Sequence, residues 1–207
     1  MDKKYTSKLS DLLGAPTTLD YISPETIPNI DLYMEQITSF MDKSLAGSKR
    51  YPDDKILTKT MINNYTKNNL IPPPTKKKYS KEHLLLLIFV YYMKDFLSIS
   101  DIRTALKPMT ERFFNNPDGI SLSDIYDTIF QLEKKEAESI PQDILRIYEL
   151  AESAFPDADP EDEDCLKTFA FICSLSFDVY IKKQLIERLL DRIGENGNTE
   201  TDSGSAR

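Results

Sequence analysis

The sequence predicts a mainly α-helical protein with one short extended segment. Apolar residues recur at three- and four-residue steps along most of the chain after Pro28, which is the period of an amphipathic helix. Small polar residues that suit helix N-caps precede several of these stretches. Three consecutive prolines, Pro72–Pro74, interrupt the pattern, because proline lacks an amide hydrogen and cannot continue a helix.

Residues 1–28 contain three prolines and show no sustained helical period. We expect an irregular N-terminal segment there, with a short helix around Ser7–Leu13. The first long helix is predicted over Asp31–Leu45, where apolar residues recur along one face. Gly47 ends it, because glycine adopts the backbone conformation at which many helices stop.

A second helix is predicted from Thr58 to Asn68. Thr58 is a suitable N-cap, and Asn69 tolerates the left-handed conformation through which many helices end. One face of this helix is apolar. The other face carries hydroxyl, amide and basic side chains, namely Lys59, Thr60, Asn63, Asn64 and Lys67.

The stretch after the second helix is stiff and basic. Pro72–Pro74 exclude a helix, and Lys76, Lys77, Lys78 and Tyr79 follow at once. We predict an extended segment of the kind found at the rim of a β-hairpin or wing.

Caps mark the next helix starts. Ser80 precedes a helix whose ten-residue apolar run, Leu84–Met93, is too short to cross a bilayer. Ser98 and Ser121 each stand three residues before an aspartate, which is the spacing of a capping box. No signal peptide is recognisable, so we expect a cytoplasmic protein with no membrane partner.

Turn residues near 110–120 predict a boundary between a domain over residues 29–112 and an acidic helical domain over residues 117–193. Pro141 opens one helix of the second domain. The acidic segment Pro156–Asp164 then separates that helix from the last one.

The last helix is predicted over Cys165–Ile193, and the polar residues 194–207 are expected to form a disordered tail. The apolar residues of this last helix are distributed around nearly its whole circumference, which favours a helix buried within its own domain. Pairing with a second copy is the alternative, although a strict heptad is absent. Cys165 and Cys173 lie roughly 12 Å apart along such a helix, too far for a disulfide. We expect both cysteines to be buried and inert, because acidic neighbours raise the pKa of a thiol, and a thiol sensor at Cys165 or Cys173 is the alternative.

Charge is distributed unevenly along the chain, whose formal net charge is −8. Residues 55–82 carry seven lysines and one acidic residue. Residues 117–207 carry twenty-one acidic residues and nine basic ones. A local basic window bears on binding partners more than the net charge does.

The sequence lacks the motifs of common catalytic sites. It has no P-loop, no Rossmann glycine fingerprint and no nucleophile elbow. One histidine, His83, and two cysteines are too few for a Cys/His zinc site. The acidic residues of 157–164 lack the glycine turn of a calcium loop. We therefore expect no enzymatic activity, no metal and no cofactor, and an effector ligand stays undefined.

The second helix and the basic segment after it suit a DNA duplex. Asparagine side chains can bond adenine edges in the major groove. Lysines on an extended loop can neutralise phosphates, which supplies affinity through counterion release. A solvated basic surface with a proline-rich connector is the alternative interpretation.

Residues 61–106, "MINNYTKNNLIPPPTKKKYSKEHLLLLIFVYYMKDFLSISDIRTAL", resemble the winged helix-turn-helix of MerR-type transcription regulators. The positions that match that family's pattern are Ile62, Tyr65, Leu70, Ile71, Pro72 and Tyr79, with Lys77 at the place of the wing arginine. Asn63, Asn64 and Asn69 replace an arginine, a tyrosine and a glycine. The resemblance implies a winged helix-turn-helix domain with a small β wing, followed by an all-α C-terminal region.

Residues 28–110, which include "DLYMEQ" and "LSISDI", are also similar to the bacterial domain-of-unknown-function family numbered 1836. That similarity implies a bacterial cytoplasmic protein with a DNA-binding domain, and it implies no ligand or target.

These observations lead to the hypothesis of a sequence-specific, DNA-binding transcription regulator. Its partner would be double-stranded DNA, and a homodimer would read half-sites about 34 Å apart. The residues assigned to DNA binding are Lys59, Thr60, Asn63, Asn64, Lys67, Lys76, Lys77, Lys78 and Tyr79. The alternative is a protein-interaction module that has a winged-helix-like fold and does not bind DNA. Asn63 in place of arginine and the sequence pI of about 4.8 favour that alternative.

Overall fold

The computed structural model describes the backbone of residues 22–202 and the side chains of residues 22–195. The short helix expected around Ser7–Leu13 lies outside this range. Within it, the chain forms two compact units. The N-terminal unit contains residues 22–131 together with residues 187–202, and the hairpin unit contains residues 132–186.

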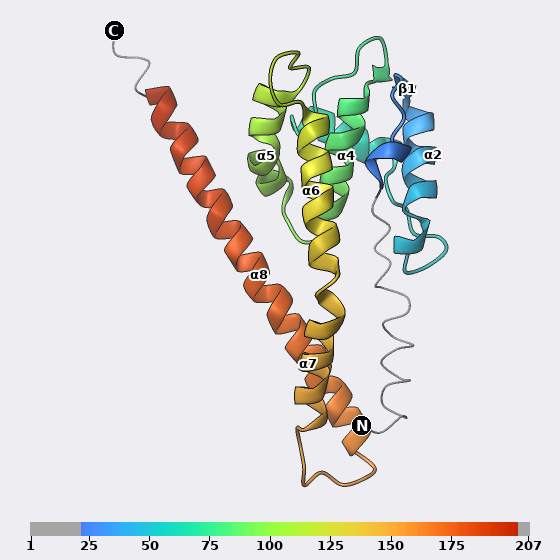
Figure 1. The fold of residues 1–207 in the computed structure, drawn as a ribbon, viewed down its shortest axis with the longest axis vertical. Helices are drawn as coiled ribbons and strands as arrows, with labels where there is room; N and C mark the ends of the chain where they lie inside the picture. The colour runs from blue at the N-terminus through green and yellow to red at the C-terminus, as the bar shows by residue number, and fades with distance from the viewer. Residues whose placement is uncertain (1–21, 203–207) are drawn as a thin grey trace. The chain divides into compact units, whose positions relative to one another are not determined.

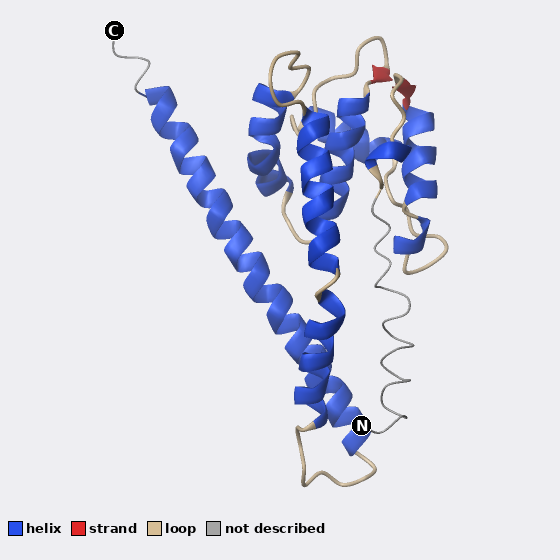
Figure 2. Ribbon diagram, viewed as in Figure 1, coloured by secondary structure: helices blue, strands red, loops and turns tan. Residues whose placement is uncertain are grey.

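Both units are helical, which confirms the predicted mainly α class (Figure 1). Figure 2 shows the strands of the described residues, β1 (Leu32–Tyr33) and β2 (Lys78–Tyr79), which form a small antiparallel sheet. The helices of the N-terminal unit are α2 (Met34–Ser44), α3 (Lys59–Lys67), α4 (Lys81–Met93), α5 (Ile99–Pro108) and the first part of α6 (Leu122–Ala137). Short turns accompany them: η1 (Pro24–Thr26), η2 (Ala46–Ser48) and the π-helical turn η3 (Met109–Phe113).

Helix α4 forms the centre of the N-terminal unit. Every residue from Leu84 to Val90 is buried, so this helix is apolar on all sides and needs neighbours all round. Figure 1 shows α4 in green, with α5 and α2 on either side of it. Burial of each large apolar side chain contributes roughly 2 kcal/mol to folding.

The N-terminal unit extends into α6. Leu122 is fully buried, and the Tyr126 ring packs edge-on against Phe89 at 5.5 Å. The Tyr126 hydroxyl donates a hydrogen bond of 2.6 Å to the Ile22 carbonyl. Because of these contacts, the N-terminal unit extends to Gln131. The boundary predicted from the sequence lies earlier, near 110–120.

The helix starts expected from capping residues are confirmed. Ser98 and Asp101 bond each other's backbone N–H, at 3.1 and 3.2 Å, and Ser121 and Asp124 repeat the arrangement. Thr58 accepts a bond of 3.2 Å from the N–H of the third residue after it, which satisfies a donor at the start of α3.

The strand β1 was not expected. Leu32 and Tyr33 lie within the predicted helix Asp31–Leu45, yet they pair with Tyr79 and Lys78 of β2. Helix α2 therefore begins only at Met34. The Tyr33 N–H donates to the Gln36 side chain at 2.8 Å, which supplies a partner at this later start.

His83 joins β2 to the core helix. The Ser80 N–H donates to His83 Nδ1 at 3.0 Å, which closes a capping box at the start of α4. The His83 ring packs edge-on against Tyr79 at 5.5 Å and Phe114 at 4.8 Å. Burial lowers the pKa of His83, and the carbonyl groups of Pro73 and Pro72 offset part of that shift.

The hairpin unit consists of the end of α6, α7 (Ile140–Glu152) and the first part of α8 (Glu163–Asp202). Tyr148 of α7 and Phe171 of α8 pack edge-on at 5.3 Å. Helix α8 starts two residues before the predicted Cys165, with acidic residues in its first turn, where the helix dipole favours them. It continues to Asp202, beyond the predicted end near Ile193 and into the predicted tail; the stretch holds no proline.

Two expectations about α8 are wrong. The helix was expected to be buried within its own domain, but many of its large apolar side chains are exposed, including Phe169, Phe177 and Tyr180. Cys165 and Cys173 were expected to be buried, and both are exposed as free thiols. Within residues 132–186, α7 packs against one side of α8, and a single helix cannot cover the whole circumference of another.

Among residues 22–202, none of the helices combines the length and the apolar character needed to span a membrane.

The buried His83 should make stability depend on pH. The folded pKa lies below the unfolded value of about 6.5, so the unfolded chain binds more protons between these two values. The contribution of His83 to the free energy of unfolding is therefore fully present above about pH 6.5, and it is lost as the pH is lowered towards the folded pKa. In His83→Gln, glutamine can still close the capping box, so this slope should vanish while aromatic packing worth about 1 kcal/mol is lost.

Urea denaturation of both proteins from about pH 7.5 to about pH 5 measures this difference. Equal slopes for wild type and His83→Gln in that window would contradict the assignment.

Candidate functional site

The basic segment forms a tight hairpin turn. Thr75 and Lys78 exchange two backbone hydrogen bonds of 3.0 and 2.9 Å across the turn. The two central residues, Lys76 and Lys77, have positive φ angles of 51° and 65°. Two such angles in succession define a type I′ turn, which normally requires asparagine or glycine. The structure therefore holds two exposed lysines in a conformation that costs each of them about 1 kcal/mol.

The two arms of this turn are stiff for different reasons. Pro72–Pro74 form the incoming arm, and their rings fix φ and remove the backbone donors that would otherwise seek a partner. The outgoing arm is β2, which pairs with β1. We call residues 72–79 the basic hairpin.

The base of the basic hairpin is anchored in the core. Tyr79 is only 3% exposed, so its ring positions the hairpin and is not available for a ligand. Burial raises the pKa of Tyr79, and a hydrogen bond with Thr66 of α3 offsets part of the rise. Lys78 is half-buried, and its ammonium lies 5.3 Å from the centre of the Tyr33 ring, in a cation–π contact. Lys76 and Lys77 are thus the lysines that the hairpin presents to solvent.

Helix α3 exposes the polar face that the sequence predicts. Thr60, Asn63, Asn64 and Lys67 are all exposed, while Ile62 and Tyr65 are buried on the opposite side. The contact between Tyr79 and Thr66 links this helix to the basic hairpin.

The two asparagines on this face differ. Asn68 donates from its side chain to the backbone and side-chain oxygens of Asn64, at 2.8 and 3.0 Å. No hydrogen bond of the Asn63 side chain is found within the described part of the chain. Asn63 is therefore the freer of the two to bond a ligand.

Asn69 provides the exit from α3. Its φ is 55°, and its N–H donates to the Thr66 carbonyl at 3.1 Å. The next N–H, that of Leu70, reaches back to the Tyr65 carbonyl at 2.9 Å. This pair of bonds is a Schellman motif, and it turns the chain towards the prolines.

Lys59 differs from the other predicted lysines because its charge is paired. Its ammonium lies 2.6 Å from the Glu35 carboxylate of α2, and this pair lowers the pKa of Glu35. Both groups are exposed, so the pair adds little stability. Any anion that reaches Lys59 must compete with Glu35.

Two basic residues that the sequence analysis did not include lie near the exit of α3. Arg103 and Lys107 of α5 line a polar hollow of about 330 Å³ together with Asn69. The other residues that line it are Thr104, Thr110 and Glu111. The four-residue spacing of Arg103 and Lys107 places them on one face of α5 and could have been read from the sequence.

The arrangement suits an anion better than a metal. Within the described residues, no group of three or more histidine, cysteine, aspartate or glutamate side chains is placed to hold a metal ion. The exposed cations of the basic hairpin and of α5 offer donors to phosphate or carboxylate oxygens.

These features define a small helical domain that presents a polar helix face and a rigid basic hairpin. The chain belongs to the family described as Domain of unknown function (DUF1836), which matches residues 22–129, just over half of the chain. The match ends close to the limit of the N-terminal unit in α6. No curated protein and no solved structure matches the chain.

The strain in the turn can be tested directly. The double variant Lys76→Asn, Lys77→Gly places the preferred type I′ residues at the two left-handed positions and should stabilise the N-terminal unit by about 1 kcal/mol or more. A higher urea midpoint with an unchanged m-value would show this gain. An unchanged or lower midpoint would contradict the assigned turn.

Proposed function

We propose that this protein is a sequence-specific DNA-binding transcription regulator that uses α3 and the basic hairpin. The observation that carries the proposal is the strained turn of Lys76 and Lys77. Stability alone would favour asparagine and glycine there, so lysine at both strained positions points to a function of the charge. Helix α3 would enter the major groove, with Asn63 at base edges, while Lys76 and Lys77 neutralise backbone phosphates.

The resemblance to MerR-type winged helix-turn-helix domains supports the same proposal. In this reading α2 and α3 are the two helices of the motif, and the basic hairpin is its wing. The predicted wing residues Lys76 and Lys77 are exposed on a two-residue turn, as a phosphate contact requires. A cytoplasmic location, where chromosomal DNA would be accessible, forms part of this proposal.

Arg103 and Lys107 extend the proposed contact. They flank the exit of α3, where a phosphate could accept hydrogen bonds from Arg103, Lys107 and the side-chain amide of Asn69. Lys107 lies 4.0 Å from the Glu111 carboxylate, so a phosphate there would compete with that carboxylate. The alternative function, a protein-interaction module that does not bind DNA, draws on the Lys59–Glu35 pair, which reduces the free positive charge on α3.

The two solvent-exposed lysines of the turn should govern the salt dependence of DNA binding. Lys76→Ala together with Lys77→Ala should weaken binding to all duplexes and lower the slope of log K against log salt by about 2, since each phosphate contact contributes about 0.9. Fluorescence anisotropy with a labelled duplex over a series of salt concentrations measures the slope.

Lys134→Ala with Lys135→Ala is the matched control, because it removes the same charge from exposed residues of the hairpin unit. If both double variants change the slope equally, the effect is one of net charge and the wing assignment fails.

Breaking the Lys59–Glu35 pair should strengthen DNA binding. Glu35→Gln releases Lys59 and removes a negative charge from the same surface, so affinity should rise several-fold at low salt. The gain should be absent when Glu35→Gln is combined with Lys59→Ala. A gain of equal size in that combination would mean that Lys59 makes no contact.

The choice of DNA sequence should depend on Asn63. Selection of bound fragments from bacterial DNA at about 150 mM salt, where non-specific affinity is weak, should enrich one site with the wild-type protein. Asn63→Ala should relax that preference at one base pair, because about 1–3 kcal/mol of discrimination against the wrong base is lost there. No enriched site, and no binding even at low salt, would favour the protein-interaction alternative.

A further inference from the structure

The hairpin unit exposes an unusual amount of apolar surface on one helix. Eight large apolar side chains of α7 and α8 are between 47% and 65% exposed: Leu150, Phe169, Ile172, Phe177, Val179, Tyr180, Ile181 and Leu185. From Cys165 to Ile181 the charged side chains on α8 are Lys167 and Asp178. A surface helix normally keeps such residues on the face that packs against its own domain.

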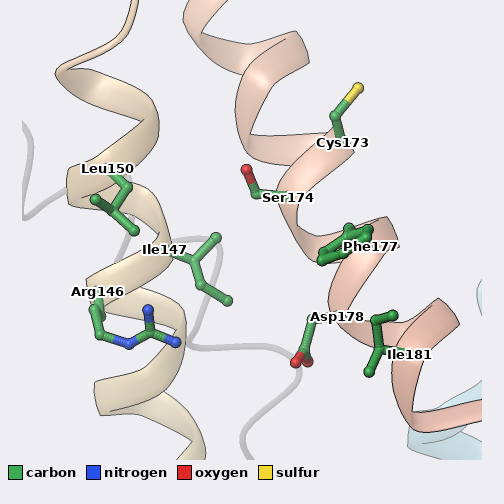
Figure 3. A pocket seen from close by; sticks show the side chains of 8 residues that line it. All are labelled: Arg146, Ile147, Leu150, Cys173, Ser174, Phe177, Asp178 and Ile181. Carbon is green, nitrogen blue, oxygen red and sulfur yellow. The ribbon is translucent and has the colours of Figure 1, made fainter.

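A groove runs along the same surface, between α7 and α8. Its volume is about 480 Å³, and Figure 3 shows Ile147 and Leu150 of α7 on one side and Phe177 and Ile181 of α8 on the other. The thiol of Cys173 points away from α7 in this view. The hairpin therefore offers both a hollow and protruding apolar side chains on one surface.

The spread of these side chains indicates how many helices are needed to cover them. At about 100° per residue, the exposed apolar residues of α8 occupy roughly two-thirds of its circumference. The seam of a two-stranded coiled coil is much narrower than this arc. Covering it takes two further helices, as in a four-helix bundle.

The exposed area also approaches what a stable pairing needs. Three of the eight side chains are aromatic, each able to bury about 150–250 Å², and five are smaller aliphatic ones, so at half to two-thirds exposure they offer roughly 600–700 Å² of apolar area. A standard-size interface takes about 800 Å² from each partner.

From these observations we propose that the occupant is a second copy of this chain, and that two α7–α8 hairpins pack antiparallel as a four-helix bundle. A second hairpin brings the two helices that the arc requires. It also brings its own protruding side chains for the groove of the first, as a self-complementary twofold interface demands.

Charge selects the antiparallel orientation. The loop before α8 and its first turn carry six acidic residues between Asp157 and Asp164, so a parallel pair would place two such clusters together. At the other end of this stretch of α8 stand Lys182 and Lys183. In an antiparallel pair the two acidic clusters lie at opposite ends, and each is level with Lys182 and Lys183 of the partner copy; Lys182 also pairs with Asp178 of its own chain at 2.9 Å.

The apolar arc of α8 indicates which residue lies at the centre of the pairing. At about 100° per residue, the arc is centred on the direction of Cys173. A twofold axis close to residue 173 also brings the Glu163–Asp164 turn of one copy to the level of Lys182 and Lys183 of the other, so that like charges stay apart. Cys173 is exposed and would then face Cys173 of the second copy. The two copies of Cys165 would be about 24 Å apart, at ~1.5 Å per residue.

Crosslinking of the full-length protein tests this register. A short bismaleimide bridges the ~8–10 Å between packed helices but not 24 Å. It should yield covalent dimers from wild type and from Cys165→Ser, and none from Cys173→Ser. Dimers that form through Cys165, or none from wild type, would overturn the proposed register.

Self-association is tested independently by sedimentation velocity at about 1–100 µM protein. Wild type should be dimeric at the upper end, and Phe169→Glu with Tyr180→Glu should be monomeric with unchanged helicity by circular dichroism. The control, Thr168→Glu with Gln142→Glu, adds the same charge at exposed positions outside the apolar arc of α8 and should stay dimeric.

A wild-type monomer over this range would mean that another surface, from this chain or a different protein, covers the apolar face, and the proposal would be wrong. The inference does not rest on DNA binding, because every residue in it belongs to the hairpin unit. Loss of dimers and loss of DNA binding are therefore separate outcomes.

Discussion

The N-terminal unit depends on keeping water away from α4. A helix that is buried on every side, from Leu84 to Val90, leaves no solvent-facing stripe, so its neighbours are fixed by the need to surround it. Helix α6 supplies one wall through Tyr126, whose hydroxyl also holds the N-terminal segment at Ile22. At the start of α4 this core helix connects to a polar surface, and there His83 replaces the glutamate or glutamine of an ordinary capping box.

The packing of His83 at the start of α4 explains how an exposed basic hairpin can be rigid. Tyr79, His83 and Phe114 pack in sequence, so the base of the hairpin is part of the core. Two hydrogen bonds across the turn and the ladder between β1 and β2 then fix the strand. The free energy gained from burial around α4 outweighs the cost of about 1 kcal/mol for each left-handed lysine. A turn on a mobile loop would avoid that cost by relaxing.

The sequence was informative where a local rule decides the structure. The starts at Thr58, Ser98 and Ser121 depend on hydrogen bonds from each capping side chain to a backbone N–H three residues away, and all three were predicted. The strand β1 was missed because Leu32 and Tyr33 continue the apolar period of α2, and only Lys78 and Tyr79, far along the chain, make them a strand. The candidate site shows the same difference between local and distant signals. The exposed polar face of α3 could be predicted from the apolar period of that helix. The Lys59–Glu35 pair joins two helices that are distant in the sequence, so no local pattern predicts it. The exposed state of α8 was missed because an all-round apolar pattern does not say which molecule covers it.

The two units differ in charge, since residues 22–131 are close to neutral whereas residues 132–186 are acidic, and this difference bears on any role with DNA. Residues 55–82 bring seven lysines to the N-terminal unit, while the loop before α8 and the first turn of α8 together concentrate six acidic residues in the hairpin unit. An acidic surface is repelled by phosphates, so productive contact with a duplex would be restricted to the faces that carry α3 and the basic hairpin. An antiparallel pair of hairpins would further separate its two acidic clusters by the ~30 Å length of this stretch of α8. The net charge of −8 thus describes neither surface, and it is compatible with a basic binding face on one unit and self-association through the other.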